Sequence, residues 1–273
     1  MKHDVKDFDI ISSLLRMSTK YGVKHIRKDI LQGMSMVWPR TLGLWDLREA
    51  EATDSAGIYK PRFLYPHPMS VCFSPIYFFQ RIIILFRLII NLAKEINAPE
   101  LLPSAFYDLS RASPSEIATG YIPPGLTDRS EVQILADDDL VNTLKGREHT
   151  SRFLSTFVVN NIESRNGSVG CLYRNEQDPF RKRICQATFE AITFEILRDV
   201  NGIIYHRNSD PLFAMMDAEL MQNRNESQSP RLNLLHRACE ICRADFAVTV
   251  DNGREELWSK LPFWFNVDLP SWL

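Results

Sequence analysis

The sequence lacks the short motifs that mark the common kinds of catalytic site. It has no G-x-S-x-G nucleophile elbow, no G-x-x-x-x-G-K-[ST] phosphate loop, no G-x-G-x-x-G dinucleotide loop and no H-E-x-x-H zinc motif. Carboxylates are plentiful, as at Glu255 and Glu256, but their pattern is typical of solvated helix faces. We therefore expect a protein that is not an enzyme, with an enzyme of unrecognised site as the alternative.

An excess of charge of one sign is also lacking. Lys and Arg together number 32 against 34 for Asp and Glu, which gives a formal net charge of -2. A strongly basic chain would indicate a polyanionic partner. The balanced charge predicts that nucleic acid is not a partner.

Long uncharged apolar runs are lacking as well. The nearest candidate is the segment 76–92, in which Arg81 and Arg87 leave only five uncharged residues between them. A membrane-spanning helix needs about 20 mostly apolar residues, and each central Arg costs roughly 2.5 to 3.5 kcal/mol. The sequence disfavours a membrane span here and favours a buried helix.

The opening residues, MKHDVKDFDI, contain no apolar stretch suited to a signal peptide. The chain has five cysteines, an odd number that suits a reducing compartment better than a framework of disulfides. We expect an intracellular protein of the cytoplasm or the nucleus.

What the sequence does have is helical periodicity. Hydrophobic residues make up 45% and charged residues 24%, which is ordinary for a globular chain that buries a core. Apolar residues recur at helical spacing, strand-like alternation is scarce, and no repeat of 20 to 50 residues is present. The sequence therefore predicts a mainly α fold, with irregular helical bundles joined by long loops.

Breaks in this periodicity predict how the chain is organised. Proline and glycine cluster in 54–69 and again in 112–136, where helical spacing is lost. The expected segments are a helical remnant (1–52), a loop with an apolar insert (53–90), a helical connector (91–111), a linker (112–136) and a C-terminal helical domain (137–273).

Four of the five cysteines form the most specific chemical pattern. Cys239 and Cys242 make a C-x-x-C, and Cys171 and Cys185 lie upstream. Four thiolates can close a tetrahedral zinc site, and C-x-x-C supplies two ligands from one turn. His236, three residues before Cys239, is a further candidate ligand.

Two other interpretations of these cysteines stay open. Structural zinc sites usually pair two short knuckles, whereas only one C-x-x-C is present and its surroundings look helical. Free cysteine is among the most buried residue types, so packing in the core is the favoured alternative. A redox C-x-x-C would need a βαβ context that the sequence does not show. The sequence predicts a candidate structural zinc site and no catalytic or cofactor-binding residue.

Aromatic residues are dense near the C-terminus, at Trp258, Phe263, Trp264, Phe265 and Trp272. Large aromatics dominate core energetics, so we expect this tail to pack onto the helices. The alternative is an exposed patch that binds a partner.

Several stretches together carry a family resemblance. They resemble BTB/POZ-domain proteins found in mushroom-forming fungi, over most of the chain except about 70–89 and 112–136, and the stretches include the four cysteines discussed above. The stretches are ISSLLRMSTKYGVKHIRKDIL, WPRTLGLWDLREA, INLAKEINAPELLPSAFYDLSR, GREHTSRFLSTFVV, CLYRNEQDPFRKRICQATFEAITFEILRD, RNSDPLFAMMDAELMQ and CEICRADFAVTVDNGREELWSKLP.

The resemblance implies an adaptor that acts through protein–protein interaction. The stretch LLRMSTKYGVKHIRKDIL resembles the closing helix pair of a BTB core, and the rest of that core would lie upstream. BTB domains imply dimerisation and, in some members, recruitment to cullin-type ubiquitin ligases. Most of the surface for those roles belongs to the core, so neither is carried over, and the oligomeric state stays open. We expect a truncated BTB-type adaptor.

Residues 70–89 interrupt a join that the family pattern would make directly, from PHPM to INLAKE. This insert is rich in Phe and Ile, as a translated pyrimidine-rich intron would be. We expect a retained intron, and the insert also contains Cys72, the one cysteine outside the set of four.

Overall fold

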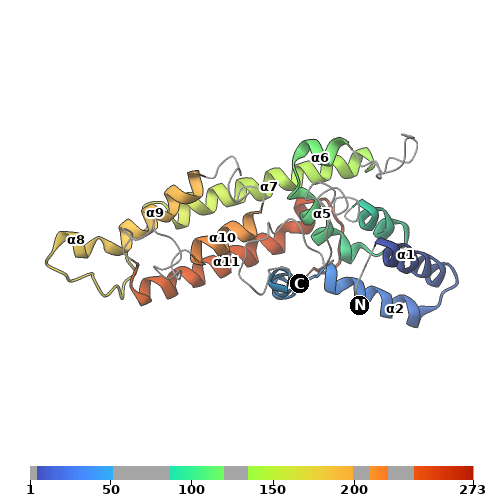
Figure 1. Cartoon of the computed structure of the whole chain (residues 1–273), viewed down its shortest axis with the longest axis horizontal. Coiled ribbons are helices and arrows are strands. Elements are labelled where there is room, and N and C mark those ends of the chain that lie inside the picture. The colour runs from blue at the N-terminus through green and yellow to red at the C-terminus, as the bar shows by residue number, and fades with distance from the viewer. Residues whose placement is uncertain (1–4, 52–86, 120–134, 199–209, 221–236, 273) are drawn as a thin grey trace. The chain divides into compact units, whose positions relative to one another are not determined.

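The computed structural model describes residues 5–51, 87–119, 135–198, 210–220 and 237–272 (Figure 1). Within these ranges the chain is helical and forms no strand, which confirms the predicted mainly α fold. The helices are α1 (Val5–Lys20), α2 (Lys24–Val37), α3 (Leu42–Glu51), a helix over 87–95, η2 (Pro99–Leu101), α5 (Leu102–Ser110), α6 (Pro114–Thr119), α7 (Asp137–Asn161), α8 (Pro179–Lys182), α9 (Ile184–Arg198), α10 (Pro211–Leu220) and α11 (Glu240–Trp264).

The chain divides into two compact units. Unit 1 comprises Met1–Arg147 and Trp258–Leu273, and unit 2 comprises Glu148–Leu257. Helices α7 and α11 each contribute residues to both units. Neither limit of unit 2 coincides with residue 137, where the sequence predicts the start of a C-terminal domain.

In unit 1, α1 and α2 form an antiparallel pair joined by a tight turn. Gly22 has φ +67°, a left-handed conformation that glycine adopts without the steric cost of a Cβ. Leu15 of α1 is fully buried, and Arg27 of α2 donates to the carbonyl oxygens of Ile96 and Asn97 at 3.1 Å each. The helix pair that the sequence predicts is therefore present and packed.

Aromatic side chains make the centre of unit 1. The ring of Trp45 lies 5.2 Å from those of Tyr107 and Trp258, and the Trp258 indole N–H donates to the carbonyl of Arg40 at 2.8 Å. The Trp272 indole N–H donates to the carbonyl of Trp258 at 2.9 Å. Buried Trp258 and Trp272 confirm the predicted packing of the aromatic tail at two of its five positions.

Two further aromatic residues of the tail differ in their exposure to solvent. Phe265 is fully buried and stacks on Phe106 with ring centroids 5.7 Å apart. Phe263, in contrast, is 83% exposed, so the prediction that the whole tail packs is wrong at this position. Helical geometry explains the difference, because residues two apart on a helix point to different faces.

Unit 1 also buries an ionic cluster that the sequence does not reveal. Arg48 donates to both carboxylate oxygens of Asp108 at 2.8 and 3.0 Å and to Glu49 at 2.7 Å. Arg111 donates to Asp108 at 2.6 Å and to Glu49 at 3.1 Å. The guanidinium of Arg48 lies 3.8 Å from the ring centroid of Trp45. Each charge thus has two partners of opposite sign, the condition under which buried charges are tolerated.

Gly146 of α7 makes room for the buried ring of Phe265. A Cβ placed on Gly146 would overlap this ring, coming within 2.6 Å of Cζ and closer still to two other carbons. Gly146→Ala is therefore expected to destabilise unit 1 by about 1–3 kcal/mol, the usual cost of overpacking. Gly33→Ala in α2 is the control: its Cβ meets nothing within 4 Å, so alanine should stabilise the helix by about 0.5–1 kcal/mol. Urea unfolding of both variants measures the difference, and equal stabilities would contradict the packing described for Phe265.

The described residues include only part of the predicted linker and of the predicted insert. The linker 112–136 begins with a helix, α6, rather than with a loop, and Ile117 of α6 is buried. Arg147 donates to the carbonyl of Ala112 at 2.7 Å, which fixes the start of the segment. Residues 120–134 lie outside the described residues, as do residues 52–86, which include Cys72 and most of the intron-like insert.

The described end of the apolar segment 76–92 is a buried helix. Arg87 is fully buried and donates to the carbonyl of Ile117 at 2.7 Å, and Ile89 and Ile90 are also fully buried. Desolvation lowers the pKa of the Arg87 guanidinium. None of the described helices is long and apolar enough to cross a membrane.

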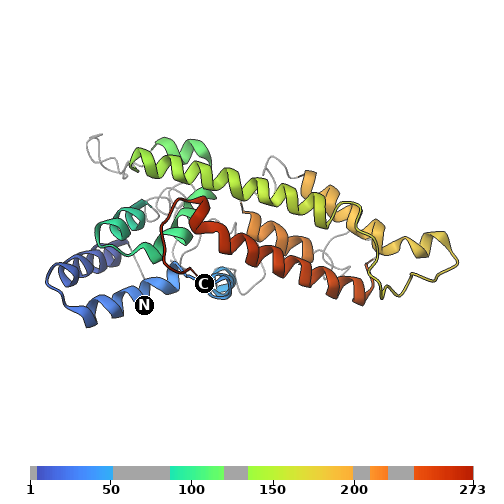
Figure 2. The same cartoon turned by 180° about the vertical axis from the view of Figure 1, so that it is seen from behind.

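Unit 2 is built from parts of α7 and α11 together with α9 and α10. Figures 1 and 2 both show α10 alongside α11, and Arg254 of α11 donates to the carbonyl of Leu212 at 3.2 Å. Asp210 caps α10 by accepting from the Phe213 N–H at 3.2 Å, as the Asp-Pro start predicts. The rings of Phe189 and Phe246 meet edge to face, 5.2 Å apart, and thereby hold α9 against α11.

Candidate metal centre

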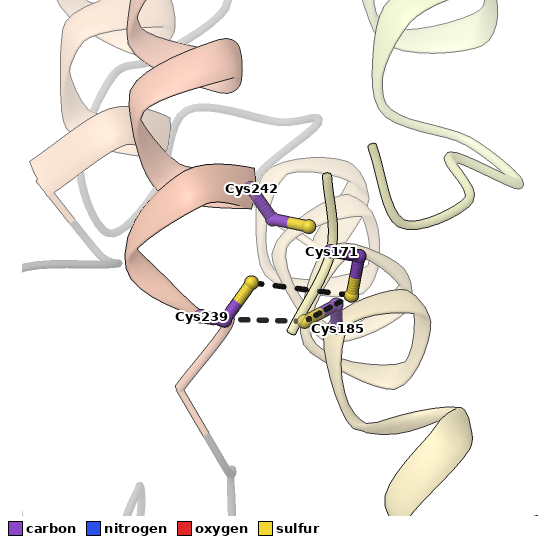
Figure 3. A group of neighbouring side chains, drawn as sticks. All are labelled: Cys171, Cys185, Cys239 and Cys242. Carbon is purple, nitrogen blue, oxygen red and sulfur yellow. Dashed lines mark hydrogen bonds between the residues drawn. The ribbon is translucent and has the colours of Figure 1, made fainter. Parts of the chain in front are cut away.

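Three separate segments of unit 2 carry the four cysteines. Cys171 lies in the loop after α7, Cys185 is the second residue of α9, Cys239 directly precedes α11, and Cys242 lies in the first turn of α11. Figure 3 shows the four side chains turned toward one another. The fold thus brings together residues that are up to 71 positions apart in the sequence, from 171 to 242.

The spacing of the sulfur atoms matches that of a tetrahedral thiolate site. All four Sγ atoms lie within 4.8 Å of one another. Cys171 Sγ is 3.7 Å from Cys185 Sγ and 3.9 Å from Cys239 Sγ. Zinc–sulfur bonds of about 2.3 Å in a regular tetrahedron require sulfur atoms about 3.8 Å apart. One ion at the centre would therefore bind all four sulfurs if the wider sulfur pairs, which are up to 4.8 Å apart, moved closer together.

The site is closed to solvent on most sides. Cys185 and Cys242 are each 1% exposed and Cys239 is 6% exposed, while Cys171 is half-buried. Gly167 lets the loop pass close to the sulfurs, because a Cβ there would stand 3.0 Å from Cys171 Sγ. Closed, buried tetrathiolate geometry is typical of structural metal sites, whereas catalytic sites keep a position open.

Backbone N–H groups are directed at the sulfur atoms. The N–H of Cys239 donates to Cys185 Sγ at 3.2 Å, and the N–H of Ser168 donates to Cys242 Sγ at 3.3 Å. Cys239 Sγ accepts from the N–H groups of Cys242 and Leu172. Such donors stabilise sulfur in its ionised, metal-binding form, in the way that outer contacts orient and tune metal ligands.

Cys239 also acts as the N-cap of α11. Its thiol accepts the N–H of Cys242, three residues on, which is otherwise without a partner in the first turn of a helix. Burial by itself raises the pKa of Cys239, but these N–H donors outweigh it and bring the pKa to about 7. These donors therefore favour the ionised, metal-binding form of this thiol.

Burial acts in the opposite sense on two of the other thiols. Desolvation raises the pKa of Cys185 and of Cys242. Ionising several adjacent buried thiols requires a compensating positive charge. A divalent ion supplies that charge and displaces the remaining protons, so the cluster suits metal binding better than it suits four free thiolates.

The prediction that these four cysteines form one cluster is confirmed, and their burial agrees with the core-packing alternative as well. Apolar spacing in the sequence predicts a last helix from about residue 234, and this is wrong at residues 237–239, because α11 begins at Glu240 after the capping residue Cys239. The C-x-x-C therefore sits at a helix entrance, a common place for a pair of ligands. His236 lies outside the described residues, so its predicted ligand role is not tested.

Sequence reasoning missed the contribution of the loop before Cys171. Ser168 donates its N–H to Cys242 Sγ, and its hydroxyl oxygen lies 3.4 Å from the same sulfur. The sequence feature that could have indicated this contact is Gly167, which directly precedes Ser168 and lies close to the candidate ligand Cys171. A glycine there is consistent with a close approach of backbone to a site.

The fold and the cluster together define a helical protein with a buried cluster of four cysteine side chains. Comparison with protein-family models, with curated proteins and with solved structures gives no match for this chain. The argument for function therefore rests on the geometry of the site and on the surface around it.

Proposed function

We propose that this chain is a non-enzymatic protein–protein interaction module whose unit 2 is held together by one structural zinc ion. The ligands are Cys171, Cys185, Cys239 and Cys242. The observation that carries the proposal is the convergence of their four Sγ atoms within 4.8 Å inside a nearly closed, buried site. Packing alone accounts for buried thiols, but it does not require four of them to meet within 4.8 Å of one another.

The chemistry of the donors selects the ion. Soft thiolate ligands prefer zinc, iron and copper(I) over magnesium, calcium and manganese, and a single tetrahedral tetrathiolate is typical of zinc. Four protein ligands complete the coordination sphere, so the ion offers no open position to a substrate. The role supported is structural.

The ion would connect the three segments that carry the ligands. The loop that contains Cys171 has no helix of its own around that residue, and Cys185 and Cys239 lie at the beginnings of α9 and α11. Bridging them constrains the unfolded chain and fixes the loop in place. The rigid surface that results suits a scaffold that presents residues to a partner.

The wider role that we propose is that of a BTB-type adaptor acting in the cytoplasm or the nucleus. The stretches that resemble fungal BTB/POZ proteins support it, and the residues of α1 and α2 include the stretch that resembles the closing helix pair of a BTB core. Reduced, metal-binding thiols are also stable in those compartments.

Metal analysis of the purified full-length chain tests the proposal. We expect about one zinc per chain by elemental mass spectrometry, and a loss of most of it in Cys242→Ser. Cys72→Ser is the matched control, because it removes a cysteine outside the set of four and should leave the zinc content unchanged. A well-folded wild-type chain without stoichiometric metal would overturn the proposal, and iron in place of zinc would correct the ion while keeping the site.

A further inference from the structure

The segment 164–183 between α7 and α9, here called the finger, exposes large apolar side chains. Val169 is 88% exposed, Leu172 is 57% exposed, and Phe180 on α8 is 87% exposed (α8 in Figure 1). Exposure of a whole phenylalanine ring to water is unfavourable, because burying such a side chain is worth about 1.5–3 kcal/mol. A fully exposed ring on a short segment that carries two further exposed apolar side chains is a candidate for a binding surface.

The finger is also basic. It contains Arg165, Arg174, Arg181, Lys182 and Arg183 against Glu176 and Asp178, with a third acid, Glu163, directly before it, although the whole chain carries a net charge of -2. Arg165 pairs with Asp245 at 2.6 Å, and Arg183 pairs with Glu190 at 3.7 Å. Neither Arg181 nor Lys182 has an ion-pair partner among the described residues. The surplus of positive charge therefore lies beside the exposed ring of Phe180.

Local structure fixes this arrangement of Phe180 with its basic neighbours. Asp178 caps α8 by accepting from the N–H of Phe180 at 3.0 Å, and Pro179 occupies the first helical position. The carboxylate of Asp178 is thus engaged with the helix start. Arg181, Lys182 and Phe180 are all exposed on this one turn.

The proposed metal centre holds together the two ends of the segment 171–185, which contains most of the finger and α8. Cys171 and Cys185 bracket the loop and α8, and their Sγ atoms are 3.7 Å apart. Closing a loop of this length removes conformational freedom that binding would otherwise have to overcome. The exposed side chains are therefore pre-organised when the metal is bound.

We infer that the finger is the docking surface for an acidic protein segment that carries apolar side chains. The inference rests on the proposed function, because it assigns a partner chemistry to the metal-supported scaffold. Carboxylates of the partner would pair with Arg181 and Lys182, and its apolar side chains would cover Phe180, Val169 and Leu172. Complementary charge of this kind steers association and selects the partner, while a buried aromatic supplies affinity. The aliphatic members favour a protein over nucleic acid, since bases stack on aromatic and guanidinium groups.

Binding of defined probes to the full chain tests this inference. The probe is a short fluorescein-labelled peptide of Glu, Leu and Phe, and its binding is measured by fluorescence anisotropy. The comparison probes are the same peptide with Lys in place of Glu, an oligoglutamate, and a single-stranded oligonucleotide. We expect the Glu-Leu-Phe peptide to bind at least about tenfold tighter than each comparison probe.

Two variants test the named residues. Arg181→Glu with Lys182→Glu, and separately Phe180→Ser, should each weaken the Glu-Leu-Phe peptide by about tenfold. The matched control is Lys24→Glu with Lys28→Glu, which reverses two exposed charges on α2 and should leave binding unchanged. All altered positions are exposed, so the variants are expected to fold.

Zinc content measured on the same samples separates the two proposals. Stoichiometric zinc with no preference for the Glu-Leu-Phe peptide overturns the docking surface alone. Selective binding in a metal-free folded chain overturns the metal centre and keeps the surface. Preference for the oligonucleotide, or equal binding by the finger variants and the α2 control, also overturns the inference of an acidic protein partner.

Discussion

Removal of the proposed zinc ion is expected to unfold unit 2. Apparent binding free energies of structural zinc in small domains are about 10–16 kcal/mol at neutral pH, which is as large as the whole stability of a typical domain, about 5–15 kcal/mol. The ligand-bearing ends of α9 and α11 would lose the link between them, and the loop around Cys171 would lose its anchor. A strong zinc chelator should therefore abolish much of the helical circular dichroism signal.

The distribution of tryptophan allows the two units to be followed separately. All five tryptophans, at 38, 45, 258, 264 and 272, belong to unit 1, so their fluorescence does not report directly on unit 2. Hydrogen exchange in α9 and in residues 240–257 should rise on chelation, and it should rise to the same extent in the double variant Cys239→Ser with Cys242→Ser. Helicity and exchange that do not respond to chelator or to the double variant would contradict a structural role for the ion.

Asp108→Asn is expected to be the most damaging of the conservative changes in unit 1, with a loss of about 3–5 kcal/mol in the free energy of unfolding. Asp108 and the two arginines that bind it are almost fully buried. Neutralising this carboxylate leaves the positive charges of Arg48 and Arg111 inside the protein with only Glu49 to balance them. The amide also offers an N–H₂ group where two acceptors are needed. Urea unfolding followed by tryptophan fluorescence measures the effect in unit 1.

Glu95→Gln is the matched control for this prediction. Glu95 accepts two hydrogen bonds from Nε of Arg16, at 2.8 and 2.9 Å, but both side chains are about half exposed, at 52% and 47%. Exposed ion pairs contribute about 0–1 kcal/mol, because water solvates both partners once the pair is broken. Equal losses in the two variants would show that burial is not what makes the Asp108 cluster costly to break.

Much of the helical structure could be predicted from local residue chemistry. Gly22 ends α1, three successive aspartates open α7, and Asp210-Pro211 opens α10, each because capping and backbone preference act within a few residues. The start of α11 was misplaced because a cysteine is not an ordinary N-cap. Only the approach of other sulfurs and N–H groups makes it one.

The buried ionic cluster could not be predicted in the same way. Arg48 and Asp108 are 60 positions apart, and each looks like an ordinary surface residue of an amphipathic helix. Their pairing depends on how α3 packs against α5, which no local pattern specifies. Arg87 is a similar case, since its partner is a backbone carbonyl 30 positions away.

The candidate metal centre could be predicted from the sequence in part. The C-x-x-C identified two ligands, and Cys171 and Cys185 could be named as candidates by their chemistry. Their convergence could not be predicted, because these two residues lie on either side of α8 and do not form a short knuckle. The supporting N–H groups belong to the backbone and leave almost no trace in the sequence.

Cobalt(II) substitution tests the central claim most directly. The full chain, freed of metal under reducing conditions and refolded with Co²⁺, should bind about one ion and show intense visible bands with sulfur-to-cobalt charge transfer, as a tetrahedral tetrathiolate does. Added zinc should displace the cobalt and bleach the colour. A weak octahedral spectrum without charge transfer, or no binding at all, would contradict the claim that these four cysteines hold one metal ion.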